Sequence, residues 1–355
     1  MKIFSIVGAR PQFIKLAPLS SALANSVHQE FIVHTGQHYD YAMSEKIFTD
    51  LGIRKPDIHL EVGAGNQTVQ ITNMMLRLEA AMIEKKPDLV IVFGDTNSTL
   101  AGALIAAKLN IPIIHIEAGL RSFNRTMPEE INRIVTDHVS RYLFAPTQTA
   151  VDNLNNEGLG KSTFLTGDIM VDTMKNSIEV ALAKSTSVAD LKLQDKPFNL
   201  LTLHRHYNVD DTGILEHILN EMGQLEEKII FPVHPRTRKM LPSTYTVPEN
   251  IELIEPQGYL DFIALEYFSK RIITDSGGIQ KEAYILQKPC ITLRTETEWV
   301  ETVSESWNLL INPSDENIAL KIIDFIVPDK QNKIFGEQVT EKMITEINTN
   351  SGLSL

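Results

Sequence analysis

Two patterns of apolar residues alternate along the chain. Short runs rich in isoleucine, valine and leucine are followed by longer segments in which apolar residues recur every three or four positions. The short runs predict buried β-strands and the longer segments predict helices. The strands are predicted at 3–8, 30–36, 89–95, 111–119, 142–147, 163–168, 199–204, 229–235, 251–256, 271–277 and 289–294. Because uninterrupted apolar strands separated by helices are typical of parallel sheets covered on both faces, the predicted fold class is α/β.

The number of strands predicts two domains. About eleven strands would be unusual in one sheet, so we divide the chain into two doubly wound domains. The first covers 1–167 and the second 168–335, and a last helix follows at 336–348. In such folds ligands bind at the carboxyl ends of the strands, so a central cleft between the two domains is the expected binding site.

Composition narrows the class of protein. The 355 residues are 43% hydrophobic and 22% charged, as in soluble globular proteins, and the formal net charge is −12. So acidic a chain is not expected to bind nucleic acid or an anionic membrane, and no run approaches the roughly 20 apolar residues of a membrane span. Residues 1–13 indicate a buried strand and not a signal peptide, so a cytoplasmic location is expected by default. The single cysteine, Cys290, excludes an intrachain disulfide, and its apolar neighbours predict a buried, inert thiol.

The first predicted strand ends in a sequence suited to anion binding. Gly8 permits a tight turn into a helix that carries Arg10 and Lys15 close to its N-terminus. Backbone N–H groups at a helix N-terminus and nearby cations favour a bound anion, although a plain turn with solvated cations would have the same sequence. No G-x-G-x-x-G or G-x-x-x-x-G-K-[ST] motif is present, so neither a nicotinamide site nor a triphosphate loop is predicted.

A second candidate for phosphate binding follows the strand at 271–277. Ser276, Gly277 and Gly278 open a helix and would present backbone N–H groups to a diphosphate. Glu282 lies about one and a half turns further on, where its carboxylate could accept hydrogen bonds from ribose hydroxyls. The structural alternative is a simple serine and glycine helix cap.

Three acids and one histidine stand at the ends of predicted strands or at the start of a predicted helix. Asp95 and Glu117 end predicted strands, Glu129 opens a predicted helix, and His204 ends the strand at 199–204. Acids converging at strand ends suit proton transfer at a carbon atom, where one group removes a proton and another returns it. Taken singly, each acid could instead serve a helix terminus or a loop, and a lone histidine is more often structural.

Metal and hydrolase chemistry are not predicted. His115 with Glu117, and His204 with His206, are spaced to share one face of a strand, but neither pair has an evident third ligand. Ser276 lacks the G-x-S-x-G context of a nucleophilic serine.

Eight ordered blocks together resemble one protein family, the non-hydrolysing UDP-N-acetylglucosamine 2-epimerases. The blocks are GARPQFIKLAPL (8–19), HTGQHYD (34–40), FGDTNSTLAGALIAA (93–107), HIEAGLRS (115–122), MPEEINR (127–133), LTLHR (201–205), EPQGYLDF (255–262) and TDSGGIQKEA (274–283). The resemblance implies two Rossmann-like domains of the GT-B type, with the C-terminal segment 336–355 packed back onto the first domain. It also implies a homodimer, a UDP-sugar substrate and no cofactor.

The resemblance further implies a reaction and a set of site residues. UDP is eliminated anti to give a 2-acetamidoglucal, and UDP then adds back with the proton delivered to the other face of C2. Such enzymes supply bacterial surface polysaccharide synthesis. The residues matched to the family's motifs are the catalytic candidates Asp95, Glu117, Glu129 and His204, and the UDP-binding candidates Arg10, Lys15, Arg133, Phe262, Ser276, Gly277, Gly278 and Glu282.

Several positions depart from the simplest family members. Gln12 stands where many have an acid, His206 and Tyr207 replace a shorter or acidic pair, and Trp299 stands where an arginine is common. With these departures the chain resembles the branch of the family that acts on UDP-2,3-diacetamido-2,3-dideoxyglucuronic acid. Arg125 is the candidate partner for the carboxylate of such a uronate. The alternatives outside this reaction are a GT-B glycosyltransferase, a hydrolysing epimerase and a non-catalytic UDP-sugar sensor.

Overall fold

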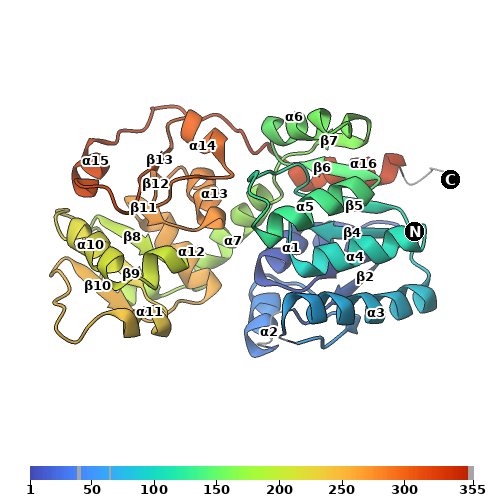
Figure 1. Cartoon of the computed structure of the whole chain (residues 1–355), viewed down its shortest axis with the longest axis horizontal. Coiled ribbons are helices and arrows are strands. Elements are labelled where there is room, and N and C mark those ends of the chain that lie inside the picture. Colours follow the sequence, from blue (N-terminus) through green and yellow to red (C-terminus); the bar gives the residue numbers. More distant parts are fainter. Residues whose placement is uncertain (38–40, 64, 351–355) are drawn as a thin grey trace. The chain divides into compact units, whose positions relative to one another are not determined.

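The computed structural model describes residues 1–37, 41–63 and 65–350. His38–Asp40 of the block at 34–40 therefore lie outside the described residues. The chain forms two compact units, which we call unit 1 (Met1–Thr173 with Lys333–Leu355) and unit 2 (Met174–Asn332) (Figure 1). In the described part of the chain, no helix combines the length and the apolar character that a bilayer crossing requires.

Unit 1 is built on a parallel sheet. Its strand order is β3-β2-β1-β4-β5-β6-β7, and every described pairing is parallel. The order reverses beside β1, which pairs with both β2 and β4, so this sheet has a topological switch point there. The strands are β1 (Lys2–Val7), β2 (Gln29–His34), β3 (Ile58–His59), β4 (Leu89–Phe93), β5 (Ile113–Ile116), β6 (Tyr142–Ala145) and β7 (Thr163–Leu165).

Helices cover both faces of this sheet. They are α1 (Arg10–Ala24), α2 (Tyr41–Asp50), α3 (Gln67–Lys85), α4 (Asn97–Lys108), α5 (Pro128–Val139), α6 (Gln148–Asn156), the 3₁₀ turn η1 (Gly160–Ser162), the first residues of α7 (Met170–Lys184) and α16 (Val339–Asn350). Ile3 and Val7 pack with α1 and α16 on one face, whereas Phe4 and Ile6 pack with α3 and α4 on the other. Burial on both faces explains why the strands are apolar without interruption.

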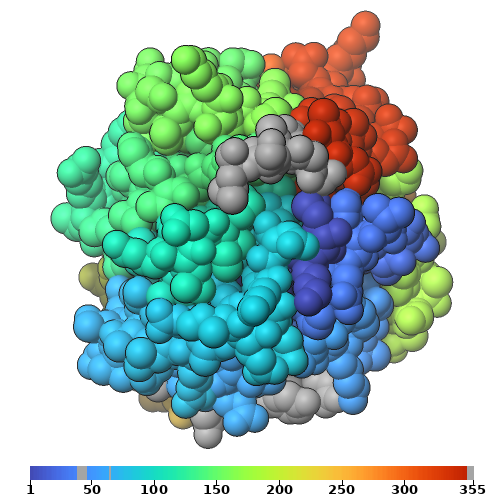
Figure 2. Space-filling view, turned by 90° about the vertical axis from the view of Figure 1, so that its right-hand side faces the viewer, coloured from blue at the N-terminus to red at the C-terminus, as the bar shows by residue number. Residues whose placement is uncertain are grey.

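The last helix completes the core of unit 1. Val339, Met343 and Ile347 of α16 belong to the same buried cluster as Leu16 and Leu19 of α1. At the amino ends of the strands, the His28 Nε2 atom lies 2.8 Å from the side-chain oxygen of Asn348. Figure 2 shows this face, where the red of α16 adjoins the blue of the first residues.

Unit 2 repeats the architecture with a six-stranded parallel sheet. Its strand order is β10-β9-β8-β11-β12-β13, reversing beside β8. The strands are β8 (Phe198–Thr202), β9 (Lys228–Pro232), β10 (Ile251–Ile254), β11 (Arg271–Thr274), β12 (Cys290–Thr292) and β13 (Asn308–Leu310). The helices are α8 (Ser187–Asp190), α9 (His206–Val209), α10 (Thr212–Met222), α11 (Pro235–Met240), α12 (Tyr259–Phe268), α13 (Gly277–Ile285), α14 (Val300–Ser304) and α15 (Ile318–Asp324).

The predicted α/β class, with doubly wound parallel sheets, is confirmed in both units. All of the predicted strands are present, although β4 ends at Phe93 and β5 at Ile116, so that Asp95 and Glu117 lie in the turns that follow. Two short strands, β3 and β13, were not predicted. β3 contains only Ile58 and His59, so no apolar run marks it, and β13 (Asn308–Leu310) is three residues long and begins with a polar residue.

Candidate active site

The carboxyl edge of the unit 1 sheet brings Lys15 and Glu117 together. Lys15 lies on α1 and is buried, and its Nζ atom is 2.5 Å from Oε2 of Glu117. Glu117 follows β5 with a φ of 72°, in the left-handed region that non-glycine residues seldom adopt. Gly94, also with positive φ, faces the pair, and a Cβ atom there would lie 3.2 Å from the lysine Nζ. A backbone held in this costly conformation around an ion pair is typical of functional sites.

Asp95, next to Gly94, is held by the α5 helix. Nη2 of Arg133 lies 2.6 Å from the Asp95 carboxylate, and the amide of Asn132 donates to the Asp95 carbonyl oxygen at 2.8 Å. The other guanidinium nitrogen of Arg133 lies 2.8 Å from Glu130. Arg133 therefore links the predicted acid Asp95 to a second carboxylate that the sequence did not point to.

Glu130 fixes the loop before α5. It accepts hydrogen bonds from the backbone N–H groups of Ser122 and Phe123 and from the Ser122 hydroxyl. Burial alone would raise the pKa of Glu130, but these donors and Arg133 together hold that pKa below its usual value. By contrast, Glu129 and Arg125 have exposed side chains, in the first turn of α5 and in the loop before it.

A buried charged cluster lies behind these turns. Nδ1 of His115 is 2.6 Å from one carboxylate oxygen of Asp137, and Nε2 is 2.7 Å from the carbonyl oxygen of Gly94. The other Asp137 oxygen is 2.7 Å from Arg121, which also pairs with Glu157. Burial would raise the pKa of Asp137, but His115 and Arg121 hold it below its usual value. Both ring nitrogens of His115 are engaged within the chain, so the ring does not serve as a metal ligand beside Glu117.

Gln12, one of the departures from the family pattern, organises the turn after β1. Its side-chain oxygen accepts from the backbone N–H groups of Gly8 and Ala9, at 2.8 and 3.2 Å. Its amide nitrogen donates to the Phe93 carbonyl oxygen and to the Thr99 hydroxyl. The amide of a glutamine supplies an acceptor oxygen and an NH₂ group with two donors, whereas a carboxylate in its place would lack the donors. Gln12 therefore suits its position.

In unit 2, His204 is oriented by Asp275. The Nδ1 atom of His204 lies 2.8 Å from the buried Asp275 carboxylate, while more than half of the histidine side chain is exposed. The backbone N–H groups of His204 and Arg205 and the amide of Asn208 also donate to Asp275. Burial opposes ionisation of Asp275, yet its hydrogen bonds, above all that from His204, keep its pKa below the usual value. The arrangement points Nε2 of His204 away from Asp275.

The α13 helix follows β11, the strand that lies next to β8 in the sheet, and His204 follows β8. Ser276 is its N-cap residue without a side-chain capping bond, and Gly277 and Gly278 form its first turn. A Cβ atom at Gly277 would clash with the carboxylate of Glu298, which in turn pairs with the buried Arg294 at 3.1 Å. Nε of Arg294 is buried with no hydrogen-bond partner among the described residues. This helix N-terminus and cation are suited to an anion.

Two further predicted positions lie nearby in unit 2. Glu282 is buried on α13, and Phe262 on α12 is half-buried against the core cluster of that face. Trp299, the departure where an arginine is common, is itself buried, and Lys281 lies 4.3 Å from the centre of its ring. The lysine thus supplies a cation that stacks on the tryptophan.

Comparison with known proteins agrees with this geometry. Residues 21–348 match the profile of a family described as UDP-N-acetylglucosamine 2-epimerase. The chain belongs to this family. It is therefore an enzyme of the isomerase class, and the family predicted from the eight sequence blocks is confirmed.

Relatives of this epimerase match along nearly the whole chain. A UDP-N-acetylglucosamine 2-epimerase homolog of Methanococcus maripaludis is 49% identical over 98% of this chain and 99% of its own. A UDP-2,3-diacetamido-2,3-dideoxy-D-glucuronate 2-epimerase of Pseudomonas aeruginosa is 46% identical over 90% of each chain. The Methanocaldococcus jannaschii UDP-GlcNAc 2-epimerase in complex with UDP-GlcNAc and UDP has a TM-score of 0.86 at 40% identity, covering 98% and 99% of the two chains.

A more distant structure shares the fold alone. The glycosyltransferase of Rickettsia africae has a TM-score of 0.54 at 15% identity over 98% of this chain and 92% of its own. The epimerase therefore has the two-sheet α/β architecture of the GT-B type, as predicted. The described residues contain no group of three or more histidine, cysteine, aspartate or glutamate side chains that could hold a metal ion.

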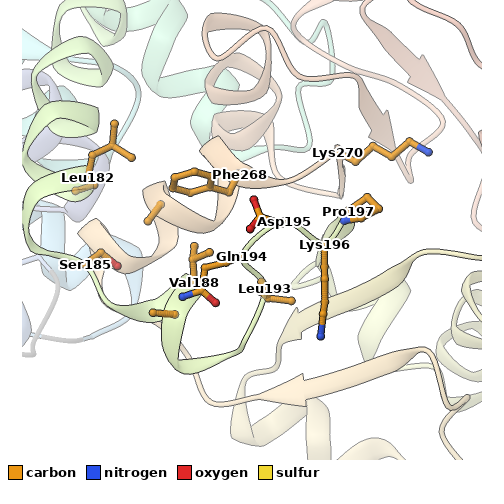
Figure 3. A pocket seen from close by; sticks show the side chains of 13 residues that line it. Leu182, Ser185, Val188, Leu193, Gln194, Asp195, Lys196, Pro197, Phe268 and Lys270 are labelled. Carbon is orange, nitrogen blue, oxygen red and sulfur yellow. The ribbon is translucent and has the colours of Figure 1, made fainter.

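Two features of the epimerase lie apart from these residues. A cavity of about 620 Å³ in unit 2 is lined by α7, α8, the end of α12 and the loop before β8 (Figure 3). In this view Lys196 and Lys270 extend away from Phe268, and none of the predicted site residues lines the cavity. Cys290 is buried in β12, which confirms its predicted burial, and this burial raises the pKa of its thiol to about 12.

Proposed function

We propose that this epimerase inverts C2 of a UDP-2-acetamido sugar, of the UDP-N-acetylglucosamine to UDP-N-acetylmannosamine type. The observation that carries the proposal is the pairing of acids and cations at one sheet edge, Glu117 with Lys15 and Asp95 with Arg133. A carboxylate can accept a proton from carbon, while the neighbouring cations can stabilise negative charge on a leaving group. The names of the relatives support the choice of substrate class.

The proposed reaction needs two proton transfers at carbon. One group removes the C2 proton as the bond between C1 and the UDP oxygen breaks, which leaves a double bond between C1 and C2. UDP then adds back to C1 while a proton reaches C2 from the opposite face. Asp95, Glu117 and Glu129 are the proposed acid–base groups, and no cofactor takes part. Since a C2 hydrogen is barely acidic, stabilisation of the departing UDP must lower much of the barrier.

Unit 2 is the proposed nucleotide-binding part. The N-terminus of α13 at Ser276, Gly277 and Gly278 offers backbone N–H groups to the diphosphate. His204, oriented by Asp275, is the proposed auxiliary group beside the diphosphate.

Other side chains are proposed to complete the UDP site. Glu282 would contact the ribose and Phe262 the uracil, as the family resemblance implies. Arg10, Lys15 and Arg133 are the proposed cations of unit 1, and two of them already pair with carboxylates there.

A second substrate has a specific observation in its favour. The Pseudomonas aeruginosa relative, 46% identical to this chain, is a UDP-2,3-diacetamido-2,3-dideoxy-D-glucuronate 2-epimerase. If the same sugar is the substrate here, Arg125 is the proposed partner of its carboxylate, and its exposed side chain is accessible to a ligand. Supply of surface polysaccharide synthesis, a cytoplasmic location and a homodimer complete the proposal, and the first and last of these rest on the family resemblance.

Turnover in D₂O tests the reaction. The enzyme is incubated with UDP-N-acetylglucosamine, and in parallel with the diacetamido-uronate, and the sugars are followed by NMR. We expect solvent deuterium at C2 of a product that still carries UDP, with no signal in the Asp95→Asn control. Retention of the original hydrogen, or accumulation of UDP with free sugar, would refute the proposed mechanism.

A further inference from the structure

His115 is buried where both of its ring nitrogens face acceptor atoms. The side chain has no exposed surface, Nδ1 lies 2.6 Å from an Asp137 carboxylate oxygen, and Nε2 lies 2.7 Å from the Gly94 carbonyl oxygen. A neutral imidazole has one N–H donor and one acceptor nitrogen. With a carbonyl on one side and a carboxylate on the other, a neutral ring would leave one nitrogen lone pair directed at an oxygen lone pair.

We infer that His115 is an imidazolium in the folded protein, and that it positions the turn that carries Asp95. A ring protonated at both nitrogens satisfies both acceptors, as charge-assisted hydrogen bonds of the observed short length. The inference concerns a residue with no part in the proposed reaction. It rests on the proposed function only for its kinetic consequence.

The charges around the ring support the cationic form. Asp137 on α5 faces His115 with one oxygen, and its other oxygen receives the guanidinium of Arg121 and the backbone N–H of Gly119. Arg121 also pairs with Glu157, which follows α6. With an imidazolium at one end, this row, which is buried except for Glu157, alternates negative and positive charges and its formal charges cancel. A neutral ring would leave one negative charge in excess, which is costly in a low-dielectric interior.

Protonation of Asp137 in place of His115 would not satisfy the same contacts. A neutral carboxylic acid could donate to Nδ1, but its second oxygen would then face Arg121 and the Gly119 N–H without a full charge. Three donors around one carboxylate favour its ionised form. The proton therefore belongs on the ring.

The other end of the ring reaches the candidate active site. The Gly94 carbonyl belongs to the peptide that joins Gly94 to Asp95, so the Nε2 hydrogen bond fixes the orientation of this peptide. The Gly94 N–H is held by the Ile116 carbonyl, and the Asp95 carbonyl by Asn132. His115 is thus a positioning residue for Asp95, and through Gly94 for the neighbouring Lys15 and Glu117 pair.

Ring NMR of the wild-type enzyme tests the protonation state. The protein is labelled with ¹⁵N-histidine, and long-range ¹H–¹⁵N spectra are recorded from about pH 6 to about pH 9, across the range where an ordinary histidine loses its proton near 6.5. We expect one slowly exchanging ring with hydrogens on both nitrogens at neutral pH. A His115 signal with a single protonated nitrogen at neutral pH would overturn the inference.

Two variants test whether Asp137 keeps the His115 ring protonated and whether His115 supports turnover. Asp137→Asn should convert the ring of His115 to the neutral form at neutral pH, and a ring that stays doubly protonated there would contradict the proposed ion pair. His115→Gln should lower kcat about tenfold to a hundredfold with KM nearly unchanged, since misplacing a catalytic group acts on the chemical step. His28→Gln, a change at the far end of the strands, is the matched control and should leave kcat unchanged.

The outcomes separate this inference from the proposed function. An enzyme that turns over no UDP-sugar would contradict the proposed function, whereas the ring spectra still decide the protonation state. Normal kcat in a folded His115→Gln variant would overturn the positioning role even if the ring proves to be doubly protonated. If that variant does not fold, Asp137→Asn and the wild-type spectra decide the inference without it.

Discussion

The substitution Asp275→Asn should destabilise unit 2 and disable His204 together. The buried carboxylate accepts from the His204 ring, from the backbone N–H groups of His204 and Arg205, and from Asn208. An asparagine keeps one oxygen and directs an NH₂ group at the remaining donors. Each hydrogen bond to a charged group contributes about 1.5–3 kcal/mol, so losing one or two of them should cost about 1.5–6 kcal/mol.

Tryptophan fluorescence makes this loss measurable. The two tryptophans, Trp299 and Trp307, both lie in unit 2, so their emission in a urea titration reports on the unfolding of that unit. The matched control is Asp210→Asn, which breaks an exposed ion pair with Arg236 and should cost less than about 1 kcal/mol. Equal urea midpoints for Asp275→Asn and the control would refute this account of Asp275.

The pH dependence of the difference follows from the lowered pKa of Asp275. A depressed folded-state pKa means that the ionised carboxylate stabilises the folded unit above the unfolded-state pKa of about 3.9. This stabilisation is lost as the pH falls through the folded-state pKa. The gap between wild type and Asp275→Asn should therefore be full at neutral pH and shrink in acid, and a gap that widens in acid would contradict the assignment.

Three further predictions concern the chemistry of the chain. Asp95→Asn, Glu117→Gln and Glu129→Gln should each lower kcat at least about a hundredfold while UDP affinity, measured by calorimetry, changes far less; near-normal turnover in any two would show that these acids are structural. Cys290 should resist alkylation by iodoacetamide at pH 8 in the folded enzyme and react rapidly in urea, because its buried thiol has a pKa of about 12; fast labelling of the native protein would contradict that burial. Arg125→Ala should reduce kcat/KM for the diacetamido-uronate about tenfold to a hundredfold and leave UDP-N-acetylglucosamine almost unaffected, since a charge-assisted pair contributes roughly 1.5–3 kcal/mol; equal effects on both sugars would exclude the carboxylate pairing.

The sequence predicts the scaffold well because strands buried on both faces need unbroken apolar runs. Runs such as those around Ile91 and Ile273 identify central strands without any homologous structure. The same pattern places the carboxyl ends of these strands only approximately, since β4 ends at Phe93 and β5 at Ile116, but it still marks Asp95 and Glu117 as candidate site residues.

The partners of these residues are less predictable. Glu117 pairs with Lys15, about a hundred positions earlier, and nothing local to either residue indicates the contact. Glu130 and Asp137 lie within an ordinary amphipathic helix pattern, so their burial depends on what the tertiary fold places against α5. The weak signal that could have found them is a carboxylate on the apolar side of a helix, where a charge needs a partner.

The return of the chain to unit 1 has a consequence for the order of synthesis. Unit 1 needs Val339, Met343 and Ile347 to close its core, yet these residues are translated after all of unit 2. A ribosome-bound chain can finish the second sheet while the first still exposes the apolar surface that α16 will cover. Folding units from the N-terminus onward is the usual order during synthesis, but here the core of unit 1 is completed last. A premature stop between Asn332 and α16 would leave unit 2 entire and unit 1 open to aggregation or proteolysis.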